Sequence, residues 1–215
     1  MQKMVITIAR QYGSGGSVVG QMLAEQLGIA YYDKELLSMV SGERGIDQDL
    51  LARADEKARP SFLFGLVRSV YDHEKPAEDL DEEVTSEKLF NYQAKLIKAV
   101  ASEESCVIIG RCADFVLKDF PNVLRVFIHA PEDKRLDRAW SIRSDLQLKE
   151  VTRYIEKVDK RRGTYYKCYT GQNWTDARNY DLCIDSGKLG YQGCVDTIVQ
   201  QLKLCYGIET GDTKK

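Results

Sequence analysis

Short apolar runs alternate along the chain with longer stretches in which apolar residues recur at helical spacing. A run of about four to eight apolar residues bounded by turn residues is typical of a buried strand, and the longer pattern is typical of a helix packed on one face. Regular alternation of the two predicts helical crossovers between parallel strands. The predicted strands are Val5–Ala9, Ala30–Tyr32, Cys106–Ile109, Val123–His129 and Tyr180–Asp185.

Helices can be placed between these strands from their start and stop signals. The segment Ser17–Leu27 has apolar residues on one face and is followed by Gly28, a residue type that commonly ends helices. A second helix is predicted to begin at Ser86, and a third, Glu132–Ile142, follows Pro131 at a position where proline is favoured. The prediction is an α/β fold: a three-layer, doubly wound, parallel five-stranded sheet with right-handed crossovers.

Two segments depart from the alternation of strands and helices. Residues 42–85 form a long insertion between the second and third predicted strands, and their acidic stretch is typical of a solvated surface. Residues 147–174 are predicted to form a charged helix that runs into an Arg- and Tyr-rich loop. Residues 1–208 are therefore expected to be one domain that carries both segments, with 209–215 as a flexible tail.

Composition narrows the classes of function. The chain has 215 residues, 43% of them hydrophobic, and 31 Lys and Arg against 33 Asp and Glu give a net charge of −2. Without a basic surplus, nucleic acid is not an expected partner, and no uncharged apolar run approaches the roughly 20 residues that a bilayer span needs. Two histidines and six cysteines without a C-x-x-C pair leave little material for a zinc site. The first apolar run is too short for a signal peptide, which predicts a cytoplasmic protein; its oligomeric state stays open.

The glycine-rich segment between the first strand and the first helix is the most informative part of the chain. Glycines let a backbone approach phosphate oxygens, successive N–H groups can form an anion-binding nest, and a helix N-terminus adds the positive end of its dipole. A hydroxyl at the end of such a loop can reach Mg²⁺. The candidate phosphate-binding residues are Gly13, Ser14, Gly15, Gly16 and Ser17, with Ser17 as the candidate metal ligand.

The segment departs from the phosphate-binding motif G-x-x-x-x-G-K-[ST] at two positions. Arg10 stands in place of the first glycine, and Gly16 stands in place of the lysine that contacts the β- and γ-phosphates. A tight strand-to-helix connection without a ligand is one alternative. A dinucleotide site is another, with Asp33 as the ribose-binding acid, although Val18 occupies the place of the third glycine of G-x-G-x-x-G.

Several motifs, in order, resemble one known family. The opening I-T-I-A-R-Q-Y-G-S-G-G-S-V-V-G, followed by Y-Y-D-K-E-L-L, resembles the cytidylate-kinase-like family of nucleotide kinases with a phosphate-binding loop. Cys106–Arg111 is similar to the strand and Gly-Arg pair that open the acceptor site in that family. Arg125–Ala130 and Tyr180–Asp185 continue the likeness, which spans roughly residues 4 to 203.

The resemblance implies an ATP- and Mg²⁺-dependent kinase that transfers the γ-phosphoryl group to a nucleotide-like acceptor on a P-loop NTP hydrolase-like fold. It also implies that residues 42–85 bind the acceptor and that 147–174 form an arginine-bearing lid. Typical cytidylate kinases keep the loop lysine and have Asp directly after the Gly-Arg pair. Here Cys112 follows Arg111 and the nearest acid is Asp114, so the resemblance does not identify the acceptor.

Phosphoryl transfer depends on positioning and charge neutralisation, and a guanidinium can clamp two phosphate oxygens at once. An N-cap role for Asp33, an exposed basic helix end at the two lid arginines, and a packing role for Cys112 are the structural alternatives. The candidate catalytic cations are Arg10, Arg138, Arg161 and Arg162, and the candidate acceptor-binding residues are Asp33, Arg111 and Asp114.

The motif departures leave two rival functions beside the kinase. A module with the same fold that binds a nucleotide without turning it over is favoured by the loss of the loop lysine and disfavoured by the lid arginines. An NAD(P)-binding oxidoreductase is disfavoured by Val18.

Overall fold

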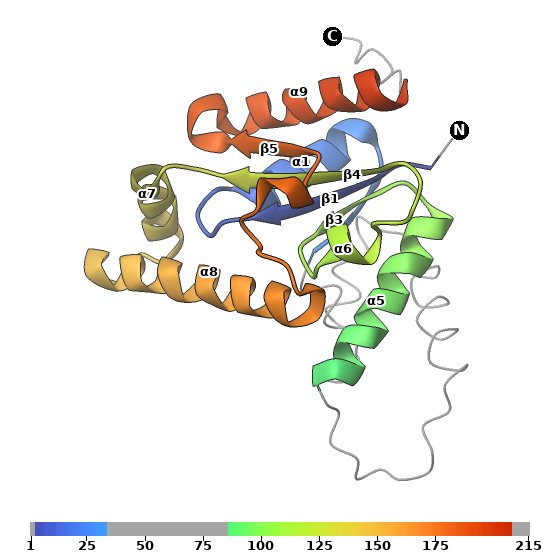
Figure 1. Ribbon diagram of the computed structural model, residues 1–215. Helices are drawn as coiled ribbons and strands as arrows, with labels where there is room; N and C mark the ends of the chain where they lie inside the picture. The colour runs from blue at the N-terminus through green and yellow to red at the C-terminus, as the bar shows by residue number, and fades with distance from the viewer. Residues whose placement is uncertain (1–2, 34–85, 208–215) are drawn as a thin grey trace, which may run out of the picture.

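A single parallel sheet organises the molecule. The computed structural model describes residues 3–33 and 86–207, so the predicted insertion 42–85 and the tail 209–215 lie outside the described residues. All strands of the sheet are parallel, in the order β2-β3-β1-β4-β5 (Figure 1). The strands are β1 (Val5–Arg10), β2 (Ala30–Tyr32), β3 (Cys106–Ile109), β4 (Val123–His129) and β5 (Leu182–Asp185).

The predicted doubly wound parallel sheet is confirmed, and its strand bounds differ mainly at β5. This strand begins at Leu182 rather than Tyr180. Asp181, just before the strand, is held beside β4: its N–H donates to the carbonyl of Arg125 at 2.8 Å, and its carboxylate accepts from the Arg125 guanidinium. The N–H of Tyr180 instead donates to the carbonyl of Ala177 at 3.1 Å, which closes the 3-10 turn that precedes the strand.

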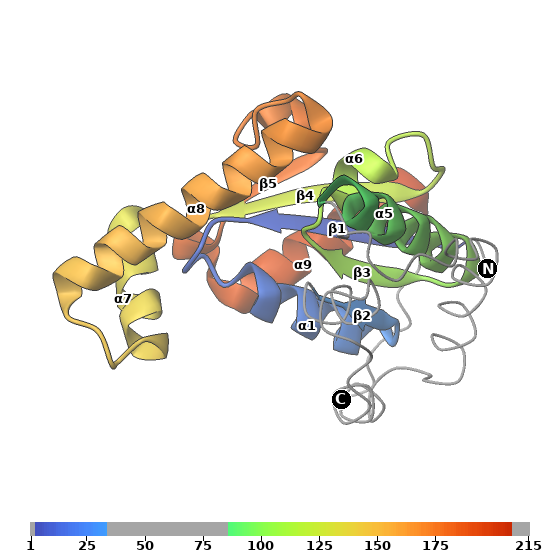
Figure 2. The ribbon, with the colours of Figure 1, turned by 90° about the horizontal axis from the view of Figure 1, so that it is seen from below.

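Helices cover both faces of the sheet. On one face, α1 (Gly16–Leu27) and α9 (Ser186–Tyr206) bury their apolar sides against strand residues such as Ile6 and Ile8. The strand residues that alternate with these, such as Val5, pack with the helices of the opposite face. Figures 1 and 2 show helices on both sides of the sheet. The helices of that face are α5 (Ser86–Glu103), α6 (Ala113–Val116) and α8 (Leu148–Thr170).

Two more elements complete the described part. Helix α7 (Glu132–Ile142) has the predicted bounds and packs on α8 beyond the carboxyl end of the sheet (Figure 1). The 3-10 turn η1 (Ala177–Asn179) precedes β5. Helix α8 continues to Thr170, so the Arg- and Tyr-rich part of the predicted lid is helical rather than a loop; Gly163 lies within the helix without ending it.

No helix in residues 3–33 and 86–207 is long and apolar enough to cross a membrane.

Candidate functional site

The loop between β1 and α1 leaves the carboxyl edge of the sheet beside α7 (Figure 1). Gly15 precedes the helix with φ 77°, which places it in the left-handed region. Within the described residues, no hydrogen bond engages the N–H groups of Gly15, Gly16 or Ser17, and the Ser17 side chain is exposed. These N–H groups and the positive end of the α1 dipole form a nest suited to an anion.

Hydrogen bonds from behind hold the loop in this shape. The buried Ser14 donates through both its N–H (3.3 Å) and its hydroxyl (2.9 Å) to the carbonyl of Gln11. The carbonyl of Ser14 accepts from the Ser186 hydroxyl at 2.6 Å and from Nη1 of Arg138 at 3.1 Å. Arg138 also donates to the carbonyl of Ser186 and lies over the ring of Tyr191. The structure therefore places Arg138 behind the loop, where its guanidinium supports the backbone.

Asp159 of α8 connects the loop to the predicted lid. Its Oδ1 accepts from the N–H of Tyr12 at 2.8 Å, and its Oδ2 accepts from Arg135, whose Nε donates to the Tyr12 carbonyl at 2.8 Å. Nη1 of Arg162 lies 3.5 Å from the same carboxylate. Burial raises the pKa of Asp159, while the Tyr12 N–H and the two guanidinium groups oppose that shift. The sequence interpretation missed Asp159 because only the adjacent arginines resembled phosphate ligands.

Arg10 and Arg162 lie together at the mouth of the loop. Nη1 of Arg162 donates to the backbone carbonyl of Arg10 at 2.8 Å. Burial, followed by repulsion from Arg162, lowers the pKa of Arg10 to about 9, whereas the nearby Asp33 raises it. Burial likewise lowers the pKa of Arg162. Two cations crowded into a partly dehydrated space are stabilised by an incoming anion, which fits phosphate binding.

The Gly-Arg pair after β3 has an unusual backbone. Gly110, Arg111 and Cys112 follow one another with φ 71°, 56° and 55°, and an L-residue in this region costs roughly 1–2 kcal/mol. Nη1 of Arg111 donates to Oε1 of the buried Gln93 at 3.3 Å, and the hydroxyl of Tyr165 reaches the same oxygen. The strained turn and Gln93 thus fix the direction of the Arg111 side chain. Sequence reasoning had no signal for Gln93, since it is one polar residue in an amphipathic helix.

Cys112 packs in the apolar cluster that includes Ala9 and Phe127. Burial raises the pKa of its thiol. This confirms the packing role expected for Cys112, because a thiol held neutral by burial is a poor nucleophile.

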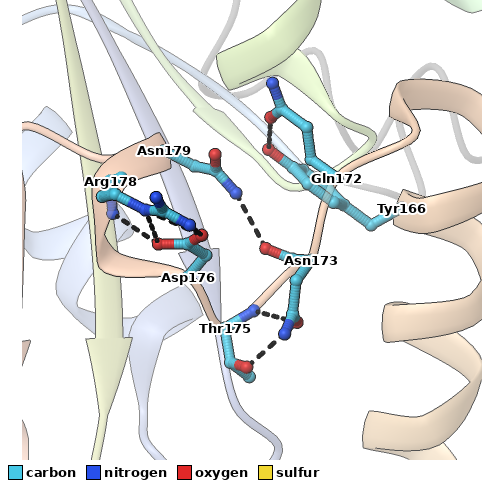
Figure 3. A network of polar contacts seen from close by, with 7 residues as sticks. All are labelled: Tyr166, Gln172, Asn173, Thr175, Asp176, Arg178 and Asn179. Carbon is cyan, nitrogen blue, oxygen red and sulfur yellow. Dashed lines mark hydrogen bonds and ion pairs between the residues drawn. The ribbon is translucent and has the colours of Figure 1, made fainter.

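Asp114, the other predicted acceptor-binding acid, is buried. Its Oδ2 accepts from the hydroxyl of Tyr166 at 2.6 Å, which joins α6 to α8. Tyr166 also contacts Gln172 at the start of the connection to β5, where Asn173 and Asp176 continue the polar network (Figure 3). Burial raises the pKa of Asp114, partly opposed by its hydrogen bond with Tyr166. In the structure this carboxyl therefore anchors the end of α8.

The raised pKa of Asp114 predicts a pH-dependent stability. A carboxyl with a higher pKa in the folded state binds more protons when folded, so the free energy of unfolding falls as the pH rises from about 3.9 through the raised value. As the pH rises through this window, the free energy of unfolding of the wild-type protein should fall relative to that of Asp114→Asn. Urea unfolding at several pH values measures both. The matched control Asp119→Asn, at an exposed position, should follow the wild type. Parallel curves for wild type and Asp114→Asn would contradict the expectation.

The structure brings only part of the predicted site together. Arg161 is exposed on α8 and makes no hydrogen bond or ion pair within residues 3–33 and 86–207. The same residues contain no group of three His, Cys, Asp or Glu side chains that could hold a metal ion, and Ser17, the predicted metal ligand, is exposed. The loop N–H groups share the carboxyl edge of the sheet with Arg10, Asp33, Arg111 and Arg162.

This arrangement defines a class. A glycine-rich strand-to-helix loop at the carboxyl edge of a parallel sheet of order 2-3-1-4-5, surrounded by arginines, is the phosphate-binding architecture of P-loop kinases. The chain belongs to the cytidylate kinase-like family, whose model matches residues 5–188.

Individual relatives agree with this membership. The cytidylate kinase of Methanosarcina acetivorans is 28% identical over 197 residues, which are 91% of this chain and 94% of that protein. The cytidylate kinase of Archaeoglobus fulgidus is 26% identical and covers 94% of this chain and 96% of its own length. These matches support a kinase-like phosphotransferase.

Solved structures support the fold. An uncharacterized protein from Eubacterium ventriosum has a TM-score of 0.69 and 30% sequence identity, covering 94% of this chain and 99% of its own. The shikimate kinase of Bacteroides thetaiotaomicron has a TM-score of 0.50 at 14% identity, covering 95% and 99% of the two chains.

Proposed function

We propose that the protein is an ATP-dependent kinase that transfers the γ-phosphoryl group to a nucleotide-like acceptor. The observation that carries the proposal is the set of open N–H groups at Gly15, Gly16 and Ser17, directly beside the crowded guanidinium groups of Arg10 and Arg162. Such a site offers an anion both dipoles and full charges. Likeness to archaeal cytidylate kinases over most of the chain supports a nucleoside monophosphate as acceptor.

The described residues divide into a donor side and an acceptor side. On the donor side the loop from Gly13 to Ser17 binds the triphosphate, and Arg162 joins it from α8. On the acceptor side Arg111 clamps the acceptor phosphate while Asp33 accepts a hydrogen bond from an acceptor hydroxyl. An acceptor oxygen then attacks the γ-phosphorus, the bond to the β–γ bridging oxygen breaks, and ADP leaves with that electron pair.

Two further predicted residues position other groups, and a third acts at long range. Arg138 positions the loop through the Ser14 carbonyl, and Asp114 positions the end of α8 through Tyr166. Arg161, exposed on α8, contributes long-range attraction for the anionic substrates.

A magnesium ion fits the donor side, because Mg²⁺ is commonly held by one or two protein oxygens together with substrate phosphates. The exposed Ser17 hydroxyl, at the start of α1, is the group that would hold it. When bound, the ion neutralises charge on the β- and γ-phosphates. We also propose a cytoplasmic location, where the six cysteines would stay reduced.

The experiment that tests the function is an acceptor screen. The protein is incubated with ATP and Mg²⁺ and each nucleoside monophosphate, with shikimate and other hydroxyl acceptors in parallel, and ADP release is followed. We expect release that depends on one nucleotide-like acceptor. ATP binding without release for any acceptor would favour the silent nucleotide-binding module, and preferential binding of NADH would favour the oxidoreductase.

Replacing Arg111 tests the acceptor side separately. Arg111→Ala removes a charge-assisted contact worth about 1.5–3 kcal/mol, so kcat/KM for the acceptor should fall roughly 10- to 100-fold while the Kd for ATP stays near that of the wild type. Arg178→Ala is the matched control, since Arg178 is an exposed arginine that pairs with Asp176 near β5. Equal kinetics for both variants would refute the role of Arg111.

A further inference from the structure

The two departures from the phosphate-binding motif are related in space. Arg10 is the last residue of β1 and replaces the first motif glycine, while Gly16 opens α1 and replaces the lysine. A Cβ added to Gly16 would lie 2.5 Å from Cβ and 2.8 Å from Cγ of Arg10. The stem of Arg10 therefore occupies the space that the first atoms of a lysine side chain at position 16 would fill.

The guanidinium of Arg10 reaches from this stem across the carboxyl ends of β1 and β3. A Cβ on Gly110, directly after β3, would overlap Nη1 of Arg10. The guanidinium thus lies between the loop, which we assign to the donor phosphates, and Arg111, which we assign to the acceptor. In a P-loop kinase the transferred group passes through this region.

The guanidinium of Arg10 has one donor atom without a partner among the described residues. Its Nε is buried and has no hydrogen-bond partner within the part of the chain that the structure describes. Arg162 and Arg111 disfavour the protonated form of Arg10, and Tyr31 and Asp33 favour it. A buried donor without an acceptor is costly, and a bound anion would remove that cost.

We propose that Arg10 supplies, from the opposite end of the loop, the phosphate-binding charge that a lysine at position 16 provides in the ordinary motif. Glycine is then required at position 16 because Arg10 passes over it. The inference rests on the proposed function for its ligand, the triphosphate of a nucleotide. The missing lysine then no longer argues for a silent nucleotide-binding module, because the cation is retained and only its position in the motif has changed.

A double-mutant cycle tests the exchange in the full chain. The variants are Arg10→Gly, Gly16→Lys and the double variant, which restores G-x-x-x-x-G-K-S. Affinities for ATP–Mg²⁺ and for tripolyphosphate are measured by calorimetry. Arg10→Gly should weaken both by at least about tenfold because the charge is lost, and Gly16→Lys should do so because the lysine overlaps Arg10. The affinity of the double variant should return to within about threefold of wild type. If the two substitutions acted independently, their losses would multiply and the double variant would bind roughly 100-fold more weakly than wild type.

Arg10→Met provides the control for folding. Methionine keeps an aliphatic stem over Gly16 without the charge, so it should reproduce the loss of ATP and tripolyphosphate affinity while the thermal midpoint changes little. If Arg10→Gly does not fold, Arg10→Met decides the point. Unchanged affinity in Arg10→Met, or a double variant as weak as the product of the two single losses, would overturn the proposal.

Binding separates this inference from the function on which it rests. If the wild-type protein binds ATP–Mg²⁺ but phosphorylates no acceptor, the proposed kinase activity is wrong, and the double-mutant cycle still decides the role of Arg10. Wild-type protein that binds neither ATP–Mg²⁺ nor tripolyphosphate would overturn both.

Discussion

Gly13→Ala is expected to lower the free energy of unfolding by about 3 kcal/mol and to weaken ATP binding by roughly 100-fold. Gly13 has φ +77°, and its added Cβ would lie 2.5 Å from the backbone oxygen of Arg135 and 3.1 Å from two further backbone atoms of that residue. Backbone within α7 cannot move aside cheaply. The strain is therefore relieved by moving the loop, whose N–H groups then no longer converge on one anion.

Gly28→Ala is the matched control for this prediction. Gly28 also has a positive φ, of +64°, but an added Cβ would meet nothing within 4 Å. Gly28→Ala should therefore lower the free energy of unfolding only by the cost of the positive φ, about 1 kcal/mol, and leave ATP affinity unchanged. Urea unfolding and calorimetry on the two variants measure both quantities. Equal losses of stability would show that contact with α7 does not restrain the loop.

The loop is restrained from several elements at once. Gly13 rests on the backbone of α7, the Ser14 carbonyl is held by Ser186 of α9, and Tyr12 is tied to Asp159 of α8. Each restraint acts on a different residue of the loop, so the anion nest is built before any ligand arrives. Such preorganisation lowers the entropy lost on binding and favours stabilisation of charge in the transition state.

The sequence predicted most of the fold because strands and helices carry local signals. The apolar run Val123–His129 and the helix Glu132–Ile142 after Pro131 have the predicted bounds in the structure. The glycine loop was found because its spacing between a strand and a helix is itself a local pattern. The start of β5 was predicted two residues early, since Tyr180 closes the preceding 3-10 turn and Asp181 pairs with the distant Arg125, and the apolar pattern shows neither contact.

The individual roles of the polar residues could not be predicted in the same way. Asp114 and Arg138 have the right chemistry for a site, yet one is buried against Tyr166 and the other supports the Ser14 carbonyl. Asp159 and Gln93 have no motif around them, and their partners lie 147 and 18 residues away along the chain. Their roles depend on tertiary contacts, which residue type and spacing do not encode.

Asp159→Ala is expected to have the second of the two largest effects, a loss of about 3 kcal/mol in the free energy of unfolding and of most ATP affinity. Burial opposes the charge of Asp159, so the ion pair itself need not stabilise the fold. Removing the carboxylate, however, leaves the Tyr12 N–H without its acceptor and Arg135 without its counter-charge. The loop then loses its connection to α8 while Arg162 loses a neutralising neighbour.

Two comparisons isolate this effect. Asp145→Ala breaks a similar pair with Arg143 at the surface, where the Asp145 side chain is 62% exposed, and should cost under about 1 kcal/mol. Arg135→Met combined with Asp159→Ala removes the orphaned cation and should recover part of the lost stability. It should not recover ATP affinity, because the Tyr12 N–H still lacks an acceptor and the loop stays unanchored. Stability and affinity that returned together would mean that Asp159 balances charge and does not shape the loop.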